Sequence, residues 1–401
     1  MIFSFVLPDA GMGGRMYYFD HSATTPPYEE VVAAMQDVLN SRYGNPSSLH
    51  RLGAEADRLL DKAREVIAEA LRLRPDGIVF TSGGTESNNM AIKGAAHRYR
   101  SRGSHLITTS TEHASVFESF RQLEREGFEV TYLPVTNEGQ IRIEDLQREL
   151  RNDTILVSVM HVNNETGAIQ PIEAVGAILR ERKQTLFHVD AIQSACKLPV
   201  EAERWGIDLL AVSAHKLRGP KGAALLYARP GIELVPLLAG GGQESGMRSG
   251  TQNVAGIVGM AKAVRLSAAE MAWFRNDAPR LKASIEAAVR GVPQLMLNGT
   301  GQPEASAPHI VNFSYPGMKP EVFVHMLEKH RIYASTQAAC SSKRSEPSRV
   351  LLEMGLGRER AASSIRISMG VGQDVREVDH LCESIRKVAD KLRPLVRHDE
   401  T

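Results

Sequence analysis

Cysteine is scarce in this chain of 401 residues, and long apolar runs are absent from it. The three cysteines, Cys196, Cys340 and Cys382, are odd in number and lack metal-ligand spacing, which argues against a disulfide framework and a zinc site. We therefore expect a reducing, cytoplasmic environment and no bound metal. No run reaches the roughly 18 apolar residues of a membrane helix. Residues 1–7 are apolar but lack the basic start of a signal peptide.

An excess of charge of one sign is also lacking. The chain carries 48 basic and 47 acidic residues, a formal net charge of +1, so no overall field attracts nucleic acid or an anionic membrane. We expect neither as a direct partner. What is present is an ordinary globular balance, with 42% hydrophobic and 24% charged residues, in a chain long enough to form two domains.

Helical and strand-like segments alternate between residues 29 and 271. Residues 29–40 and 54–73 carry apolar side chains at helical spacing. Near-continuous apolar strands separated by helices are typical of an α/β domain whose mostly parallel sheet is covered on both faces. Seven short apolar runs, most of them bounded by Gly, Asn, Asp or Pro, predict a sheet of seven strands: 78–82, 105–109, 130–135, 154–160, 185–190, 209–213 and 223–228.

The rhythm of the chain changes after residue 271, which indicates a smaller α+β domain over 272–401. The glycine-rich run 239–250 precedes this boundary and favours a functional loop. We expect the N-terminal segment 1–28 to join the smaller domain, with residues 1–15 as a candidate upstream extension. The helices predicted in the smaller domain lie near 278–291, 320–330, 347–355 and 374–392, and its strands at 309–315 and 364–370.

One predicted strand runs into two glycines, Gly83 and Gly84, then Thr85 and a helix, in the sequence "IVFTSGGTESNN". Glycines let backbone N–H groups approach an oxyanion, and the N-terminus of a helix adds positive potential. The pattern is that of a phosphate cradle, although an ordinary glycine turn with a threonine cap has the same residues. Ligands of open α/β sheets bind beyond the carboxyl ends of the strands. The residues at the other strand ends therefore help to decide between a phosphate cradle and an ordinary turn.

Two further strand ends carry charged residues. Asp190 ends an apolar strand, with Gln193 three residues later. A buried carboxylate needs a partner, and a protonated pyridine ring is one such partner. The alternative interpretation is that Asp190 caps the N-terminus of a helix. Ser213, His215 and Lys216 directly follow another strand. A lysine there forms a Schiff base readily when desolvation lowers its pKa, and the alternative is a surface lysine on a turn.

Two loops add polar side chains to the same predicted edge of the sheet. His113 follows the strand 105–109 in "TEHASV", where a structural histidine is the alternative. Asn163, Asn164 and Glu165 follow the strand 154–160. The asparagines are suited to a cofactor oxygen or a substrate carboxylate, or simply to supporting a turn.

Taken in order, these motifs resemble the cysteine desulfurases of the NifS and IscS kind, in the class-V aminotransferase branch of fold-type I pyridoxal-phosphate enzymes. The resemblance extends from about residue 17 to 390 and implies that fold, with pyridoxal 5'-phosphate as cofactor. The motifs that carry it are "YFDHSATTP", "FTSGGTESNN", "TEHASV", "HVNNETG", "HVDAIQSA", "SAHKLRGPKG", "GMRSGTQN", "ACSS" and "SSIRIS".

The resemblance implies a role for each matching residue. Lys216 resembles the Schiff-base lysine, Asp190 the partner of the pyridine nitrogen and Gln193 that of the ring hydroxyl. His113 resembles the histidine that stacks on the ring and assists proton transfer. The remaining roles implied are phosphate binding by Gly84, Thr85, Ser213, His215 and, from the second subunit of a homodimer, Thr251, and substrate-carboxylate binding by Asn164 and Arg366, with Asn164 also touching the cofactor.

Cys340 is the expected nucleophile. It lies in a polar stretch, the loop expected near 335–348, where Lys343 and Arg344 favour the reactive thiolate. Cys196 and Cys382 lie in segments with the character of core or helix. In this sequence Gln337 stands where the family typically has glycine, a difference similar to variants dedicated to tRNA thiolation.

The activity that the resemblance implies is removal of sulfur from L-cysteine, which releases L-alanine and leaves a persulfide on Cys340. A sulfur-acceptor protein of iron–sulfur cluster assembly or tRNA thiolation would then take the sulfur. Rival interpretations are a selenocysteine or cystine lyase or an aminotransferase on the same cofactor, none of which needs Cys340. A scaffold that docks sulfur-transfer partners is a further alternative, in which Lys216 and Arg366 would have no purpose.

Overall fold

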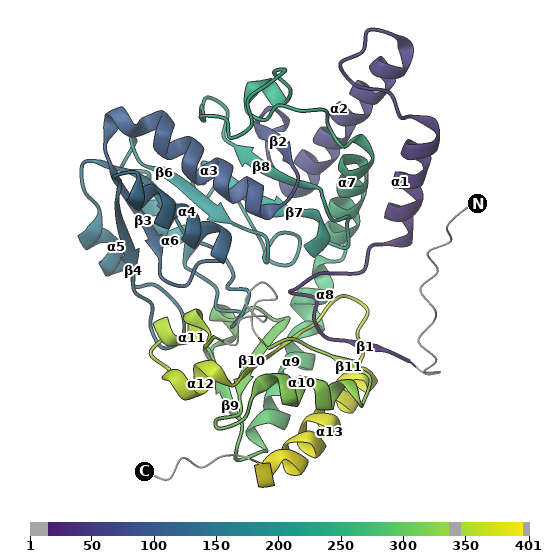
Figure 1. Ribbon diagram of the computed structural model, residues 1–401, viewed down its shortest axis with the longest axis vertical. Coiled ribbons are helices and arrows are strands. Elements are labelled where there is room, and N and C mark those ends of the chain that lie inside the picture. Colours follow the sequence, from purple (N-terminus) through teal and green to yellow (C-terminus); the bar gives the residue numbers. More distant parts are fainter. Residues whose placement is uncertain (1–14, 337–345, 396–401) are drawn as a thin grey trace.

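The computed structural model describes residues 15–336 and 346–395, which form two packed units (Figure 1). The larger unit contains a seven-stranded sheet with the strand order β2-β8-β7-β6-β5-β3-β4. Its strands are β2 (Ile78–Thr81), β3 (His105–Thr109), β4 (Glu129–Leu133), β5 (Thr154–Ser158), β6 (Leu186–Asp190), β7 (Leu209–Ser213) and β8 (Ala224–Ala228).

The strands β4, β3, β5, β6 and β7 run parallel to one another, whereas β8 is antiparallel to both β2 and β7. The predicted mostly parallel sheet of seven strands is therefore confirmed. Because β3, β5, β6 and β7 are parallel, the loops that follow them leave from one edge of the sheet, which is where ligands bind in such folds.

Alternate side chains of each strand enter two separate cores. On β3, Ile107 packs into a core with helices α2, α6 and α7, while its neighbour Leu106 packs into another with α3 and α4. Helices thus cover both faces of the sheet, as the apolar strands require. The helices of this unit are α1 (Glu29–Ser41), α2 (Arg51–Leu71), α3 (Gly84–Tyr99), α4 (Ala114–Arg125), α5 (Ile143–Glu149), α6 (Ile172–Leu179) and α7 (Val254–Ala269).

The smaller unit is built on a three-stranded antiparallel sheet in the order β12-β10-β9. Its core joins this sheet to α9, α10 and α13. Within the part of the chain that the structure describes, no helix combines the length and apolar character needed to cross a bilayer. The elements are β9 (Met296–Asn298), β10 (Ile310–Ser314), β12 (Ser364–Ser368), α8 (Met271–Asn276), α9 (Ala278–Arg290), α10 (Pro320–Glu328), α11 (Arg349–Glu353), α12 (Arg358–Ala362) and α13 (Val375–Leu392).

The start of the described chain packs on the smaller unit before it enters the larger one (Figure 1). Strand β1 (Tyr17–Tyr18) pairs in parallel with β11 (Ile332–Tyr333), and the fully buried Phe19 enters the core of the smaller unit. The turn that follows reaches across to the larger unit, where the Thr25 hydroxyl donates to the His215 carbonyl over 2.8 Å. This turn therefore lies where the two units meet.

Candidate active site

A cavity of about 170 Å³ opens at the carboxyl edge of the large sheet, against the smaller unit. Ten of the twelve site residues predicted from the sequence line it, from the ends of five different strands of the large sheet and from β12 of the small one. These ten are Gly84, Thr85, His113, Asn164, Asp190, Gln193, Ser213, His215, Lys216 and Arg366.

One side of the cavity is suited to an oxyanion. Gly84 and Thr85 form the first turn of α3, whose N-terminus carries positive potential. A side chain at Gly84 would begin 2.2 Å from Cδ1 of Ile192, which also lines the cavity, so glycine keeps this approach open. Burial and the charge of Lys216 lower the pKa of His215 to about 4, which makes it a neutral ligand at pH 7.

Another part of the cavity is suited to a cation, because Asp190 provides a negative charge there. Its carboxylate is buried at the end of β6 and accepts hydrogen bonds from Asn88 Nδ2 at 2.8 Å and from the Ile192 backbone N–H at 2.9 Å. Both donors are neutral, so they leave the negative charge beside the cavity. A protonated pyridine nitrogen is the kind of group that this carboxylate would stabilise.

Gln193 presents an unused acceptor to the same cavity. Its Nε2 donates to the Ser22 carbonyl over 3.0 Å, whereas its buried Oε1 has no hydrogen-bond partner among the described residues. A buried acceptor without a donor is costly unless a ligand supplies one. A ring hydroxyl would do so, and the cavity therefore fits pyridoxal phosphate at the phosphate, the ring nitrogen and the hydroxyl.

Lys216 and His113 bring an amine and an imidazole to the same cavity. Lys216 lies in a short turn after β7, and its Nζ donates to the carbonyls of Ser22 and, over 2.6 Å, Ala23. His113 caps α4, with Nδ1 accepting from the Ser115 backbone N–H at 3.1 Å. In the neutral ring the proton is therefore assigned to Nε2, and burial lowers the pKa of His113 and so favours that neutral form.

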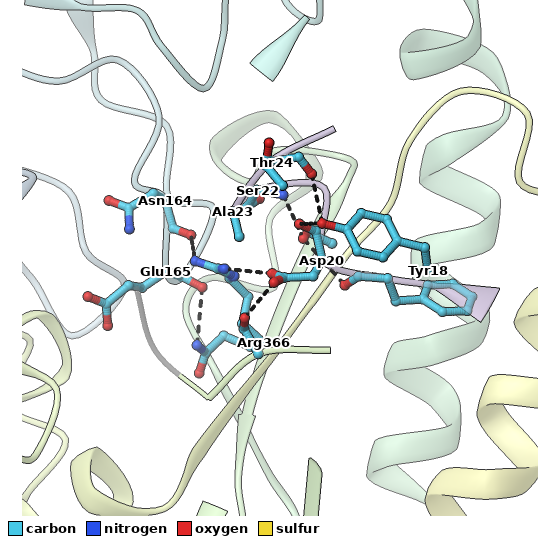
Figure 2. A network of polar contacts seen from close by, with 12 residues as sticks. Tyr18, Asp20, Ser22, Ala23, Thr24, Asn164, Glu165 and Arg366 are labelled. Carbon is cyan, nitrogen blue, oxygen red and sulfur yellow. Dashed lines mark hydrogen bonds and ion pairs between the residues drawn. The ribbon is translucent and has the colours of Figure 1, made fainter. Parts of the chain in front are cut away.

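Arg366 brings a positive charge from the smaller unit. Its side chain is 1% exposed on β12, where Nη1 donates to the Asn164 carbonyl at 2.9 Å and Nη2 to Asp20 Oδ1 at 2.8 Å. Figure 2 shows the guanidinium between the Asn164 loop and the turn at Asp20. A planar guanidinium is suited to a carboxylate of a substrate.

The structure does not place the other two predicted residues, Thr251 and Cys340, in the lining of this cavity. Thr251 borders a separate cavity together with Ser82, Arg248 and Gln252. Cys340 lies outside the described residues. Of the other two thiols, Cys196 and Cys382 are both buried and free, and burial raises the pKa of Cys196 to about 12, which keeps it an unreactive thiol.

Sequence reasoning missed five residues that line the cavity or hold its lining. Three of them, Ser22, Ala23 and Asp20, belong to the motif "YFDHSATTP", whose sequence alone indicates no role for them. Met160 and Ile192 resemble ordinary core residues in the sequence. The cavity lining that was not predicted is Ser22, Ala23, Met160 and Ile192, and Asp20 contacts it through Arg366.

Comparisons with known proteins agree with these features. The model of the family described as Aminotransferase class-V matches residues 17–381. The cysteine desulfurase IscS of Dictyoglomus turgidum is 42% identical over 386 residues, which cover 95% of this chain and 96% of the relative. The IscS of Vibrio vulnificus is 44% identical over 383 residues, covering 94% of each.

A solved NifS-like protein has a similar fold. It superposes with a TM-score of 0.87 at 36% identity and covers 94% of this chain and 100% of its own. DndA from Streptomyces lividans superposes with a TM-score of 0.74 at 35% identity, covering 86% of this chain and 97% of its own. The chain therefore belongs to the class-V aminotransferase family and, within it, to the cysteine desulfurases.

Proposed function

We propose that this enzyme takes the sulfur of L-cysteine, releases L-alanine and holds the sulfur as a persulfide on Cys340. The observation that carries the proposal is the single cavity in which Lys216, Asp190 and Arg366 meet. An amine, a ring-nitrogen partner and a carboxylate clamp are the three groups needed to hold and deprotonate an amino acid on a pyridoxal ring.

The cofactor is pyridoxal 5'-phosphate, which when bound supplies an aldehyde for amines and a ring that draws electrons from the substrate. In the proposed arrangement Gly84, Thr85, Ser213 and His215 hold the phosphate. Asp190 would keep the ring nitrogen protonated, Gln193 Oε1 would accept a hydrogen bond from the ring hydroxyl, and His113 would contact the ring.

The remaining steps belong to residues of the chain. Arg366 orients the substrate carboxylate, and the Lys216 amine takes the proton from Cα. The Cys340 thiolate then attacks the substrate sulfur, so an S–S bond forms as the Cβ–S bond breaks. The electron pair of the broken bond remains on the substrate, where Cβ takes a proton and becomes the methyl group of alanine, and Lys216 returns a proton to Cα.

We also propose a homodimer that shares its active sites. Thr251 follows the glycine-rich run 239–250, and exposed apolar side chains precede this run at Leu237 and Leu238. Leu39 and Tyr43 are likewise exposed on and beside α1. Apolar side chains exposed in this number favour burial against a second copy, and Thr251 is the residue that we expect to reach the partner's phosphate.

The persulfide needs an acceptor, and we propose a sulfur-acceptor protein of iron–sulfur cluster assembly or tRNA thiolation. Gln337, which stands where the family typically has glycine, is the feature of the sequence that bears on the choice between these two kinds of acceptor. We further propose a cytoplasmic location, because the free thiols Cys196 and Cys382 suit a reducing compartment.

The test of this function is the variant Cys340→Ser. We expect it to bind pyridoxal phosphate and L-cysteine normally but to release almost no alanine, because a hydroxyl is a far poorer nucleophile toward sulfur than a thiolate. Mass spectrometry after a pulse of cysteine should find one added sulfur on the wild-type peptide that contains Cys340.

Cys382→Ser is the matched control, because the buried Cys382 thiol on α13 donates to the Ser284 carbonyl and neither residue lines the cavity. It should retain the wild-type rate of alanine release. Alanine and free sulfide formed by Cys340→Ser at the wild-type rate would exclude the persulfide and favour a lyase.

A further inference from the structure

The buried Arg366 has a resident carboxylate of its own. Its Nη2 donates to Asp20 Oδ1 over 2.8 Å, and the two residues are 346 positions apart in the sequence. Figure 2 shows Asp20 approaching the guanidinium from the turn after β1, on the side away from Glu165. The group proposed to bind the substrate carboxylate is therefore paired with a carboxylate of the protein itself.

The burial of Arg366 explains why such a partner is needed. Only 1% of its side chain is exposed, and its Nε has no hydrogen-bond partner among the described residues. The Asn164 carbonyl, which accepts from Nη1, is neutral. A cation removed from water is strongly destabilising without a counter-ion, and Asp20 is the carboxylate that forms an ion pair with it.

Asp20 is itself held in place at both ends. Its second oxygen, Oδ2, accepts from the Ser335 hydroxyl at 2.7 Å. Its backbone carbonyl lies 3.1 Å from the Tyr18 hydroxyl, whose single proton is shared between this carbonyl and that of Thr24 at 2.9 Å. These contacts fix the carboxylate against Arg366, so it remains near the guanidinium when another anion approaches.

We propose that Asp20 determines which anions Arg366 accepts, acting as a positioning residue and an internal competitor for the guanidinium. An incoming carboxylate must share Arg366 with Asp20, whose fixed negative charge repels it. Simple anions have only this one interaction and are rejected. An α-amino acid has a second attachment through its amine, which supplies the binding energy that a simple anion lacks.

This inference rests on the proposed function, because it takes Arg366 as the residue that binds the substrate carboxylate. Its test is the variant Asp20→Asn, which keeps the shape and one acceptor oxygen but removes the charge. Acetate is the probe, used with the cofactor-loaded enzyme at constant ionic strength. We expect acetate to raise the melting temperature of Asp20→Asn at concentrations about ten-fold lower than for the wild type, close to the size of one charge interaction that solvent strongly screens.

A carboxylate-free analogue separates this role from general disturbance of the cavity. Asp20→Asn should strengthen competitive inhibition by acetate about ten-fold and leave inhibition by cysteamine, which lacks the carboxylate, unchanged. The double variant Asp20→Asn/Arg366→Gln should lose the gain for acetate. A matched control is Asp76→Asn, which removes a carboxylate paired with Arg74 at 2.7 Å on the surface and should respond to acetate as the wild type does.

Ser335→Ala provides a second, milder variant should Asp20→Asn fail to fold. It frees Oδ2 of Asp20 without removing charge, and we expect a gain in acetate affinity of about two- to three-fold. Equal acetate responses of the wild type and these variants would overturn the inference. That result leaves the proposed function standing if the wild type still converts cysteine to alanine, so the two failures are distinguishable.

Discussion

Lys197 shows how a single buried residue can work against the stability of the fold. Its side chain is buried beneath the active site, and its Nζ has no hydrogen-bond partner among the described residues. It borders a small cavity together with His21, Lys216 and Arg218. Burial, assisted by the charge of Lys216, lowers the pKa of Lys197 to about 7.

This pKa shift predicts a stability that depends on pH. An unfolded lysine keeps its ordinary pKa near 10.5, so between pH 7 and about 10.5 the unfolded state binds more protons than the folded state, and stability rises with pH. The penalty is complete below pH 7, at about 3–5 kcal/mol. Lys197→Met should therefore stabilise the protein at pH 7, with a benefit that shrinks toward pH 10.

Urea unfolding of both proteins at pH 7 and pH 9.5 measures this difference. The exposed Lys62, which pairs with Glu65 at 2.9 Å on the surface, gives the matched control Lys62→Met. That control should change stability little at either pH. A Lys197→Met protein that is no more stable than the wild type at pH 7 would contradict the unpaired state of this lysine.

At the residue scale, the sequence predicts groups whose chemistry follows directly from a strand end. Asp190, Ser213 and Lys216 are of this kind, because parallel strands bring their carboxyl ends together. Asp20 could not be assigned in this way, since its partner Arg366 lies 346 positions away in the sequence and their contact depends on the tertiary fold. The burial of Lys197 is equally invisible in the sequence, where the residue looks like an ordinary surface lysine.

At the scale of elements, apolar runs predicted the seven large-sheet strands to within a few residues. The third run was predicted to span 130–135, but β4 ends at Leu133 because Pro134, which has no N–H, follows it. The short strands β1, β9 and β11 were not predicted, since two or three residues carry no periodicity. These strands exist because partners distant in sequence complete their hydrogen bonds.

Helix α6 depends on a glycine for its close approach to a neighbouring turn. A side chain at Gly176 would begin 1.8 Å from the Trp205 carbonyl oxygen, which belongs to the backbone and cannot rotate away. Gly176→Ala must therefore push the helix and the turn apart. We expect a loss of about 1–3 kcal/mol in the free energy of unfolding, the usual cost of overpacking.

Urea unfolding followed by circular dichroism measures this loss. Gly301→Ala is the control, because nothing lies within 4 Å of the side chain that it adds and its backbone is not left-handed. It should unfold at the wild-type midpoint. If Gly176→Ala shares that midpoint, the close contact between α6 and the turn does not constrain the fold.

At the scale of the whole molecule, the active site is assembled where two units meet. The larger unit supplies most of the cavity lining, β12 supplies Arg366, and the turn at Asp20 bonds to both. The proposed role of Thr251 raises the question whether a second chain also contributes to the active site. Its loop is tied to α3 by Arg248, which pairs with Glu86 at 2.8 Å, so it lies beside the phosphate cradle without lining the main cavity.

Two inactive variants can decide whether Thr251 serves the cavity of its own chain or that of a partner. Lys216→Ala removes the amine proposed to react with the cofactor, and Thr251→Ala removes the proposed phosphate ligand. If Thr251 reaches across a dimer, a mixed dimer has one cavity with both defects and one with neither. Random mixing of equal amounts makes about half of the dimers mixed, so about a quarter of the wild-type activity should return.

The control is a mixture in which both variants carry Lys216→Ala, which should stay inactive under the same exchange conditions. Differently tagged chains and two-step purification then isolate the mixed dimer, which should have about half the activity of the wild type. If Thr251 serves its own chain, every cavity in that dimer keeps one defect and no activity returns. A monomer in sedimentation that is fully active would contradict the shared site altogether, because a lone chain could then bind the phosphate without any residue from a partner.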